Sequence, residues 1–434
     1  RFNAEYQAKG GSKLKITPGD AFLSFITLYG YDAIDEKTAS ELKELITKSW
    51  EEFELLQEDK EIELKMAPSQ EKKSLFSSIL HPLSSPKLKI AFIYEKTPGT
   101  SAWTYAHELG RLYLEQTFPD ELQTICFENA TLDTVDAQIQ DAIDLGCNLI
   151  FTTTPAFVQA SVKAAIANRE VRILNCSLNT SHRYIRTYYS RMHEAKFLMG
   201  AIAGAMSENN RLMYIADYPI YGSIANINAF ALGAKMINPR AKVYLEWSTK
   251  KDVDLDERIR ETQSSCISGR DMVIPEEASR FFGIYHMDGG YPRNLAMPLY
   301  HWGKFYEQLI RTIMNGTWKY DDDPTSTKAI NYWWGMSAGV VDVVCSHHLP
   351  IGTKRLVELL KATISSELFN PFSGILYSQS GVVTDDPDSS LAPEEIMTMD
   401  WLVENVIGSI PKKEELKEQA VPVIDQQGVN KKEG

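Results

Sequence analysis

Several groups of residues have types and spacings that could support catalysis. Gly335–Gly339 fits the G-x-S-x-G pattern of a serine nucleophile elbow, and His107-Glu108 begins like the zinc motif H-E-x-x-H. An elbow requires a helix directly after the serine, whereas a β-like run over Val340–Cys345 follows here. His107-Glu108 lacks the second histidine of the zinc motif. Neither pattern therefore predicts an active site.

Metal and phosphate sites are not indicated either. Cys345, His347 and His348 lie close together in the sequence, but their number and spacing do not match a zinc site. The acidic run Asp321–Asp323 is typical of a solvated loop, and no Walker A or G-x-G-x-x-G stretch occurs. We therefore expect no catalytic residue, no metal and no cofactor.

Other residues have types that suit ligand binding, and they follow predicted strands. Trp103 and Tyr105 lie at the start of a predicted helix, where a flat ring could stack on a heterocycle. The hydroxyl of Thr153 and the nearby helix N-terminal amides could bond polar ligand atoms. Ligands of open parallel sheets lie beyond the carboxyl ends of the strands. These positions therefore predict a binding cleft.

A second group follows strands further along the chain. Asp217, Tyr218 and Tyr221 come after one strand, and Asp288 ends another, where a carboxylate could accept from a ring N–H, an amine or a ribose hydroxyl. Each position also has a structural interpretation: the two aspartates as turn or cap residues, and Trp103 as a packing residue. The aromatic residues of the segment that crosses between the two halves are expected to pack there: Tyr184, Tyr188 and Tyr189.

Alternating strands and helices must position these residues. Lys89–Tyr94 is a continuous apolar run, as expected of a strand buried on both faces. Strands and helices alternate from there, and the pattern occurs twice, before and after Tyr184–Arg191. This predicts an α/β protein with two lobes, each containing a doubly wound parallel sheet. The other predicted strands are 123–127, 148–153, 172–176, 211–216, 242–247 and 282–287, with one near Cys266; the helices are 101–116, 132–145, 155–167, 194–207, 223–236, 254–262 and 301–315.

The expected organisation has five parts. Residues 1–86 form a mostly helical N-terminal segment and linker, in which Thr38 and Glu41 make a capping box. Residues 87–190 with 300–330 form lobe 1, and 191–299 form lobe 2. Residues 331–410 are expected to pack on lobe 1 as added strands and a helix. The Lys/Glu/Gln-rich residues 411–434 are expected to be a disordered tail.

Charge and cysteine content limit the partners and the compartment. The chain of 434 residues carries a net charge of -13, which argues against nucleic acid and anionic membranes as partners. No apolar run approaches the length of a transmembrane helix. Five scattered cysteines and the lack of a signal segment or lipidated cysteine favour a cytoplasmic location over that of a cell-surface lipoprotein.

The sequence resembles the basic membrane protein family, the purine-nucleoside-receptor-like substrate-binding proteins of ABC importers. The resemblance runs from about Lys87 to Gly381. It rests on KIAFIY…SAWTYAHELGR, LIFTTTPAFVQASVKAA, YYSRMHEAKFLMGAIAGAMS, YIADYPIYGSIANINAFALGAKMINPRAKV and NGTWK…WWGM…NPFSGILYSQSG. TPGTSAWTY replaces the family's usual D-K-S-F-N stretch, which leaves the choice among purines open.

The resemblance implies a two-lobed, type I periplasmic-binding-protein fold that binds a purine base or nucleoside without chemistry, with an ABC permease as partner. It implies that Trp103 stacks on the ligand, that Arg191 and Glu194 belong to the crossing motif, and that Asp288 reads polar ligand groups. Three alternatives remain open: a cytoplasmic purine sensor with an N-terminal effector domain, a nucleoside hydrolase and a sugar-binding protein.

Overall fold

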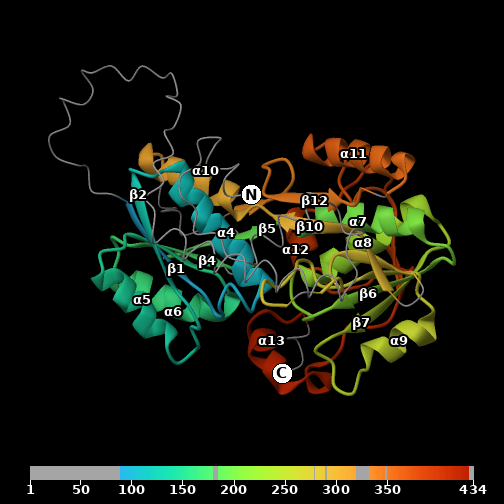
Figure 1. Cartoon of the computed structure of the whole chain (residues 1–434), viewed down its shortest axis with the longest axis horizontal. Coiled ribbons are helices and arrows are strands. Elements are labelled where there is room, and N and C mark those ends of the chain that lie inside the picture. Colours follow the sequence, from blue (N-terminus) through green and yellow to red (C-terminus); the bar gives the residue numbers. More distant parts are fainter. Residues whose placement is uncertain are drawn as a thin grey trace, which may run out of the picture.

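The computed structural model describes residues 88–178, 184–277, 279–288, 291–318, 332–347 and 349–429. These form two α/β lobes, each built on one large sheet, which lie side by side in Figure 1. The predicted N-terminal segment, the Asp321–Asp323 run and His348 lie outside the described residues. Across the described ranges, no helix is both long and apolar enough to cross a bilayer.

The first sheet contains six parallel strands in the order β11-β5-β4-β3-β1-β2. Alternate residues of β1 face opposite cores: Ile90 and Phe92 join the cluster under the helices α4 and α10, and Ala91 and Ile93 join the cluster under α5 and α6. Both faces of the sheet are covered, which explains the continuous apolar run. The elements are β1 (Leu88–Ile93), α4 (Ala102–Thr117), β2 (Leu122–Phe127), α5 (Val135–Asp144), β3 (Leu149–Thr152), the 3-10 turn η2 (Pro155–Phe157), α6 (Val158–Ala167), β4 (Arg172–Cys176), β5 (Arg186–Ser190), α10 (Trp302–Met314) and β11 (Tyr332–Trp334).

The second sheet contains seven strands in the order β12-β10-β9-β8-β6-β7-β15. The two-lobed α/β prediction is confirmed, but this sheet is not parallel throughout, because β9 and β10 run antiparallel to their neighbours. The sequence analysis missed β10, whose two prolines disfavour a strand. The elements are α7 (Met192–Met206), β6 (Arg211–Ala216), α8 (Ser223–Ile237), β7 (Lys242–Trp247), α9 (Leu255–Thr262), β8 (Cys266–Ser268), β9 (Ile284–Asp288), β10 (Tyr291–Tyr300), β12 (Val341–Cys345) and β15 (Val406–Ile407).

Helices α7 and α8 pack closely enough for backbone to touch backbone. A Cβ added to Gly200 of α7 would overlap the carbonyl oxygen of Phe230, and one added to Gly233 of α8 would overlap that of Phe197. The first turns of α7 are buried on every side. This close approach packs α7 and α8 together as one unit of the second lobe.

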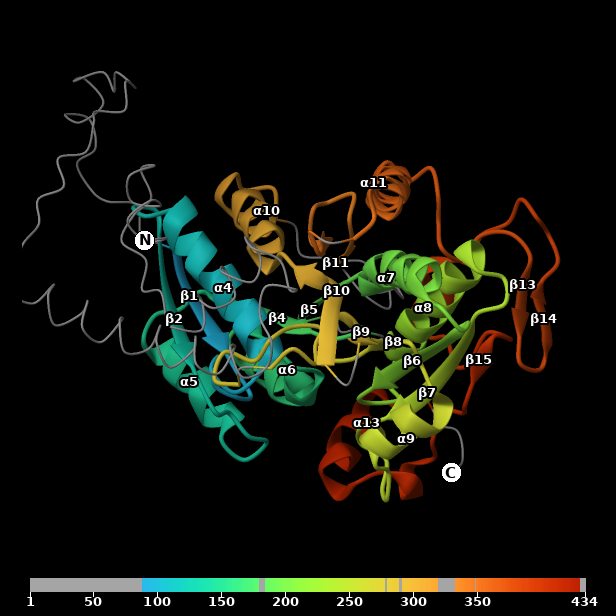
Figure 2. The ribbon, with the colours of Figure 1, turned by 45° about the vertical axis from the view of Figure 1, so that its right-hand side comes forward.

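The C-terminal part of the chain corrects two predictions. Residues 331–410 do not pack on lobe 1 as a unit, because β12 and β15 extend the second sheet and α11 (Ile351–Ser365) packs on α7. β11 alone of these strands joins the first sheet. Residues 411–429 are ordered rather than a disordered tail, with η3 (Lys413–Glu415), η4 (Glu418–Ala420) and α13 (Val421–Gln427). Figure 2 shows the hairpin β13–β14 (Leu376–Ser378, Gly381–Thr384) at the edge of the second lobe, and α12 (Pro393–Met397) is labelled near the middle of the molecule in Figure 1.

Candidate functional site

Trp103 lies where the two lobes meet, in the first turn of α4. Its indole N–H donates to the carbonyl oxygen of Thr153, which follows β3, at 2.7 Å. Its ring stacks on Tyr189 with centroids 5.9 Å apart and meets Tyr300 edge-on at 5.4 Å. Trp103 is partly exposed, so the structure gives it a packing role and leaves part of its surface open.

Thr153 and Tyr105 are more enclosed than the sequence predicts. The hydroxyl of Thr153 is buried and donates to the carbonyl oxygen of Ile93 at 3.1 Å, so it closes the end of β3 against β1. Tyr105 is 4% exposed and belongs to the core cluster. Of Trp103, Tyr105 and Thr153, only Trp103 is therefore partly exposed rather than buried.

Three residues that the sequence analysis did not select form a chain of contacts that reaches Trp103 through the ring of Tyr300. Lys196, in the second turn of α7, forms an ion pair with Asp271, which follows β8. The side chain of Lys196 is 3% exposed and that of Asp271 is 29% exposed. The hydroxyl of Tyr300, at the end of β10, donates to Asp271 at 3.4 Å. Aromatic and ionic groups from both lobes thus meet, and we call Trp103, Tyr189, Lys196, Asp271 and Tyr300 the interlobe site.

The charges of the interlobe site are set by burial and by this pairing. Burial alone would lower the pKa of Lys196, but Asp271 and Tyr214 favour its charged form, and the net pKa is raised. Burial, followed by the Asp271 carboxylate, raises the pKa of Tyr300 well above its ordinary value. At neutral pH Lys196 is therefore an ammonium and Tyr300 a neutral phenol.

A sequence signal for this ion pair did exist. Lys196 directly precedes the apolar run Phe197–Met206 of α7, and a lysine is rarely buried unless a carboxylate pairs with it. The identity of that carboxylate could not be read locally, because Asp271 is far away in the sequence.

Arg191 and Glu194 hold the crossing segments together. The Arg191 Nε donates to the carbonyl oxygen of Trp333 at 3.0 Å, and its guanidinium lies over the Trp333 ring. Glu194 accepts the backbone N–H of Met336 at 2.7 Å, and a Cβ on Gly335 would overlap its carboxylate. Burial raises the pKa of Glu194, although the Met336 amide and Arg191 act in the opposite direction. In this structure the pair positions residues 333–336 rather than lining an open space.

The residues after β6 contact the C-terminal segment. Asp217 is exposed and accepts from the hydroxyl of Ser248 at 2.5 Å. Tyr218 packs on a small apolar cluster with Ile424, and the Tyr221 amide donates to the carbonyl oxygen of Gln427 at 3.0 Å. The structure does not bring these three residues together with Trp103. Asp288 ends β9 as predicted, with its backbone paired to Tyr291.

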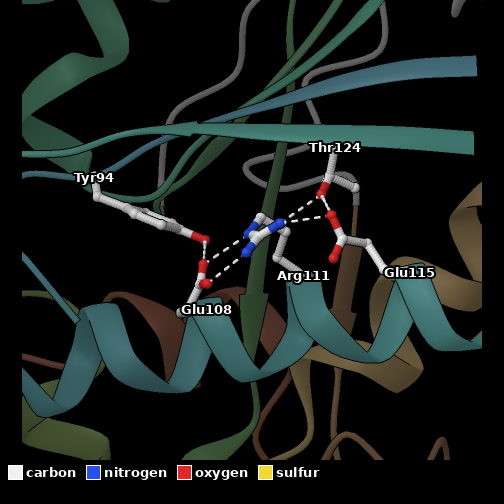
Figure 3. A network of polar contacts seen from close by, with 5 residues as sticks. All are labelled: Tyr94, Glu108, Arg111, Glu115 and Thr124. Atoms are coloured by element: carbon white, nitrogen blue, oxygen red, sulfur yellow. Dashed lines mark hydrogen bonds and ion pairs between the residues drawn. The ribbon is translucent and has the colours of Figure 1, made fainter. Parts of the chain in front are cut away.

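A charged network fixes the helix that carries Trp103 (Figure 3). Arg111 of α4 donates to both oxygens of Glu108, at 2.8 and 2.6 Å, and to Glu115 at 2.8 Å and Thr124 of β2 at 2.6 Å. Tyr94, after β1, donates to Glu108 at 3.0 Å. The network ties one face of α4 to β1 and β2 and so fixes the direction in which Trp103 points.

The motifs considered for catalysis have structural roles in the described residues. His107 is fully buried, contacts the Tyr306 hydroxyl at 2.6 Å and stacks on Trp302. Ser337 is exposed and donates to Glu367 at 3.1 Å, and β12 follows it as predicted. Burial raises the pKa of Cys345 to about 11. In the part of the chain that the structure describes, no three His, Cys, Asp or Glu side chains gather to hold a metal.

Two buried histidines predict a loss of stability in acid. Burial, reinforced by Arg191, lowers the pKa of His193 from 6.5 to about 3, and burial lowers that of His107 as well. The unfolded chain therefore binds protons below about pH 6.5 that the folded protein does not, so the free energy of unfolding falls as pH drops from 6.5 towards 3. His193 should contribute about 1.4 kcal/mol per pH unit in this window, and His107 should act in the same direction.

The measurement is urea unfolding of wild type and His193→Phe between pH 7.5 and 4.5. Phenylalanine suits the contacts of His193 with Trp333 and Phe372, so the variant should show a shallower pH dependence. Equal slopes for the two proteins would contradict the assignment.

Residues 87–275 match the family model of the PnrA-like ABC transporter substrate-binding proteins. A purine-binding protein of Brucella abortus is 27% identical over 341 residues, which cover 75% of this chain and 95% of that protein. A putative ABC transporter glucose-binding protein of Haloferax volcanii is 23% identical over 275 residues, covering 60% and 67%.

One solved structure agrees at the level of the fold. It is a transcriptional activator of the comK gene from Bacillus halodurans, with a TM-score of 0.51 and 14% identity, covering 65% of this chain and 99% of that one. Its likeness supports the two-lobed architecture and nothing finer.

Proposed function

We propose that this chain, whose residues 87–275 match the family model of the PnrA-like ABC transporter substrate-binding proteins, binds a purine base or nucleoside between its lobes. The ligand is released unchanged, and the partner that receives it is an ABC permease. The relative from Brucella abortus, named as purine-binding, supports this choice of ligand.

The observation that carries the proposal is the position of Trp103. Its ring lies at the carboxyl ends of the first sheet's strands, and its indole N–H is already bonded to Thr153, so its orientation is fixed before any ligand arrives. A pre-oriented aromatic face loses little conformational entropy when a flat heterocycle stacks on it. Tyr189 and Tyr300 continue the aromatic wall.

The ionic part of the interlobe site supplies groups that a purine edge requires. Asp271 has free acceptor capacity for a ring N–H or an exocyclic amine, and its side chain is partly exposed beside the aromatic wall. Lys196 is almost fully buried and holds the Asp271 carboxylate in place. A ligand with an N–H donor on a flat ring would use the remaining acceptor capacity of Asp271, whereas a purely apolar ligand would cover this carboxylate without bonding to it, at a cost.

The direct test is to denature the purified protein, identify released small molecules by mass spectrometry, and then titrate the ligand-free protein calorimetrically. The titrants are adenine, adenosine, guanosine, inosine and glucose. Binding of a purine without glucose binding is the expected result. Glucose binding without any purine would overturn the ligand assignment, and turnover of a nucleoside would overturn the non-catalytic role.

Replacing Trp103 with alanine is expected to weaken purine binding by about 1–3 kcal/mol, or roughly 5- to 150-fold, since this is the scale of one aromatic–base stack. Trp103→Phe keeps an aromatic face but loses the bond to Thr153, so its purine affinity should lie between those of wild type and Trp103→Ala. Calorimetric titration measures both variants, with thermal unfolding as a check of the fold. An unchanged dissociation constant in Trp103→Ala would remove the stacking role.

A further inference from the structure

The chain ends in a segment that reaches from the second lobe to the first. We call residues 411–429, which contain η3, η4 and α13, the C-terminal strap. Figure 1 shows α13 in red at the lower side of the molecule, where the two lobes meet. The strap lies beyond every element needed to complete either large sheet.

The strap is attached firmly to the second lobe. The Lys417 backbone N–H donates to the carbonyl oxygen of Thr249 at 2.8 Å, and the Lys251 N–H donates to that of Glu415 at 2.9 Å. Lys250 also forms an ion pair with Glu415 at 3.4 Å. These bonds fix the start of the strap along the loop after β7.

The middle of the strap covers the loop after β6. Leu416, Ala420 and Ile424 form a buried apolar cluster on which Tyr218 and Ile220 pack. Past α13, the Val429 amide donates to the carbonyl oxygen of Pro219 at 3.2 Å. The strap therefore moves with the second lobe as one body.

Two side chains of the strap form hydrogen bonds with the first lobe. The amide of Gln427 donates to the carbonyl oxygen of Leu178, beyond β4, at 2.9 Å. The amide of Gln426 donates to the carbonyl oxygen of Ala156 in η2 at 3.2 Å. Gln427 is 5% exposed, so its bond is shielded from water. Both acceptors lie just beyond strands of the first sheet, on the side of the sheet edge where ligands bind.

We propose that the C-terminal strap is a built-in latch that holds the two lobes together through Gln426 and Gln427. The inference rests on how the strap's contacts are divided between the lobes. If the lobes opened, the strap's bonds to the second lobe would remain, whereas the bonds of Gln426 and Gln427 to the first lobe would break. Hinge closure is a common mode of action for two-lobed binding proteins, and a latch lowers the rate of reopening. For ligand exchange the inference rests on the proposed function, but lobe opening itself does not.

The test compares wild type with Gln426→Ala/Gln427→Ala. Gln419→Ala is the matched control, because Gln419 is an exposed glutamine of the same strap. In the ligand-free double variant, small-angle scattering should give a larger radius of gyration, and amide exchange in α13 and η2 should rise about tenfold, the scale expected for losing two hydrogen bonds. The control should match wild type. Unchanged scattering and exchange in the double variant would overturn the latch.

Two further measurements distinguish a failure of the latch proposal from misfolding of the double variant and from a failure of the proposed function. Gln426→Ala alone leaves the buried Gln427 in place and serves if the double variant does not fold; it should show a smaller change in the same direction, and no change would count against the latch. Dissociation of adenosine or guanosine, followed by stopped flow, should be about tenfold faster in the double variant. If neither binds wild type, the proposed function fails, whereas the scattering and exchange results still decide the latch.

Discussion

Gly233→Ala is expected to destabilise the protein by more than about 3 kcal/mol, enough to lose most soluble protein. A single methyl group there would overlap the carbonyl oxygen of Phe197 in α7. Both atoms belong to backbones of buried helices, so neither side chain rotation nor a small shift relieves the overlap. The two helices would have to separate and expose the core between them.

Gly352→Ala is the matched control for this prediction. Gly352 also lies in a helix, α11, but it is exposed, and an added Cβ has no atom within 4 Å. Alanine there should leave stability unchanged or raise it by up to about 1 kcal/mol through helix propensity. Urea unfolding followed by circular dichroism measures both variants. Similar midpoints for the two would show that α7 and α8 can part at little cost.

Asp271→Ala is expected to destabilise the ligand-free protein by about 3–5 kcal/mol, because it leaves the charge of Lys196 buried and unpaired. Removing both charges, as in Lys196→Met/Asp271→Ala, should recover most of this loss, since an apolar side chain tolerates that environment. The double variant should nevertheless bind purines poorly if the pair reads the ligand.

An exposed ion pair provides the comparison. Lys163→Ala breaks the pair with Asp136, whose two side chains are 74% and 49% exposed, and should change stability by less than about 1 kcal/mol. Chemical unfolding at pH 7 and low salt ranks the four proteins. If Asp271→Ala lowered the free energy of unfolding no more than Lys163→Ala does, the prediction would be wrong. Lys196 would then have to bond to water or to another partner in the interlobe site.

The sequence predicts locally encoded elements well. Arg211–Ala216 and Lys242–Trp247 are strands with the predicted bounds, because the first is apolar after Arg211 and the second alternates between buried apolar residues and less buried ones. β10 was missed since Pro292 and Pro298 argue against a strand, yet it pairs with β9 and β12 at those residues. Its pairing depends on partners far away in the chain, which local pattern does not reveal.

In the candidate site, too, the local positions of residues could be predicted from the sequence, but their distant partners could not. Trp103 lies at the start of a helix beyond the first strand, as its spacing indicates. Tyr218 and Tyr221 lie beyond β6 as predicted, but their partners come from the C-terminal strap, which had been interpreted as a disordered tail. Charged composition describes the solvent-facing side of such a segment and says little about its few buried contacts.

The strand order also has a consequence during protein synthesis. β7 ends at Trp247, but β15, which protects its outer edge, begins only at Val406. A ribosome adds roughly 5–20 residues per second, so the edge of β7 remains unpaired for on the order of ten seconds while the rest of the chain is made. Unpaired edges attract other nascent chains. Until Val406 has been made, the second lobe therefore offers an unpaired strand edge that a ribosome-bound chaperone could cover.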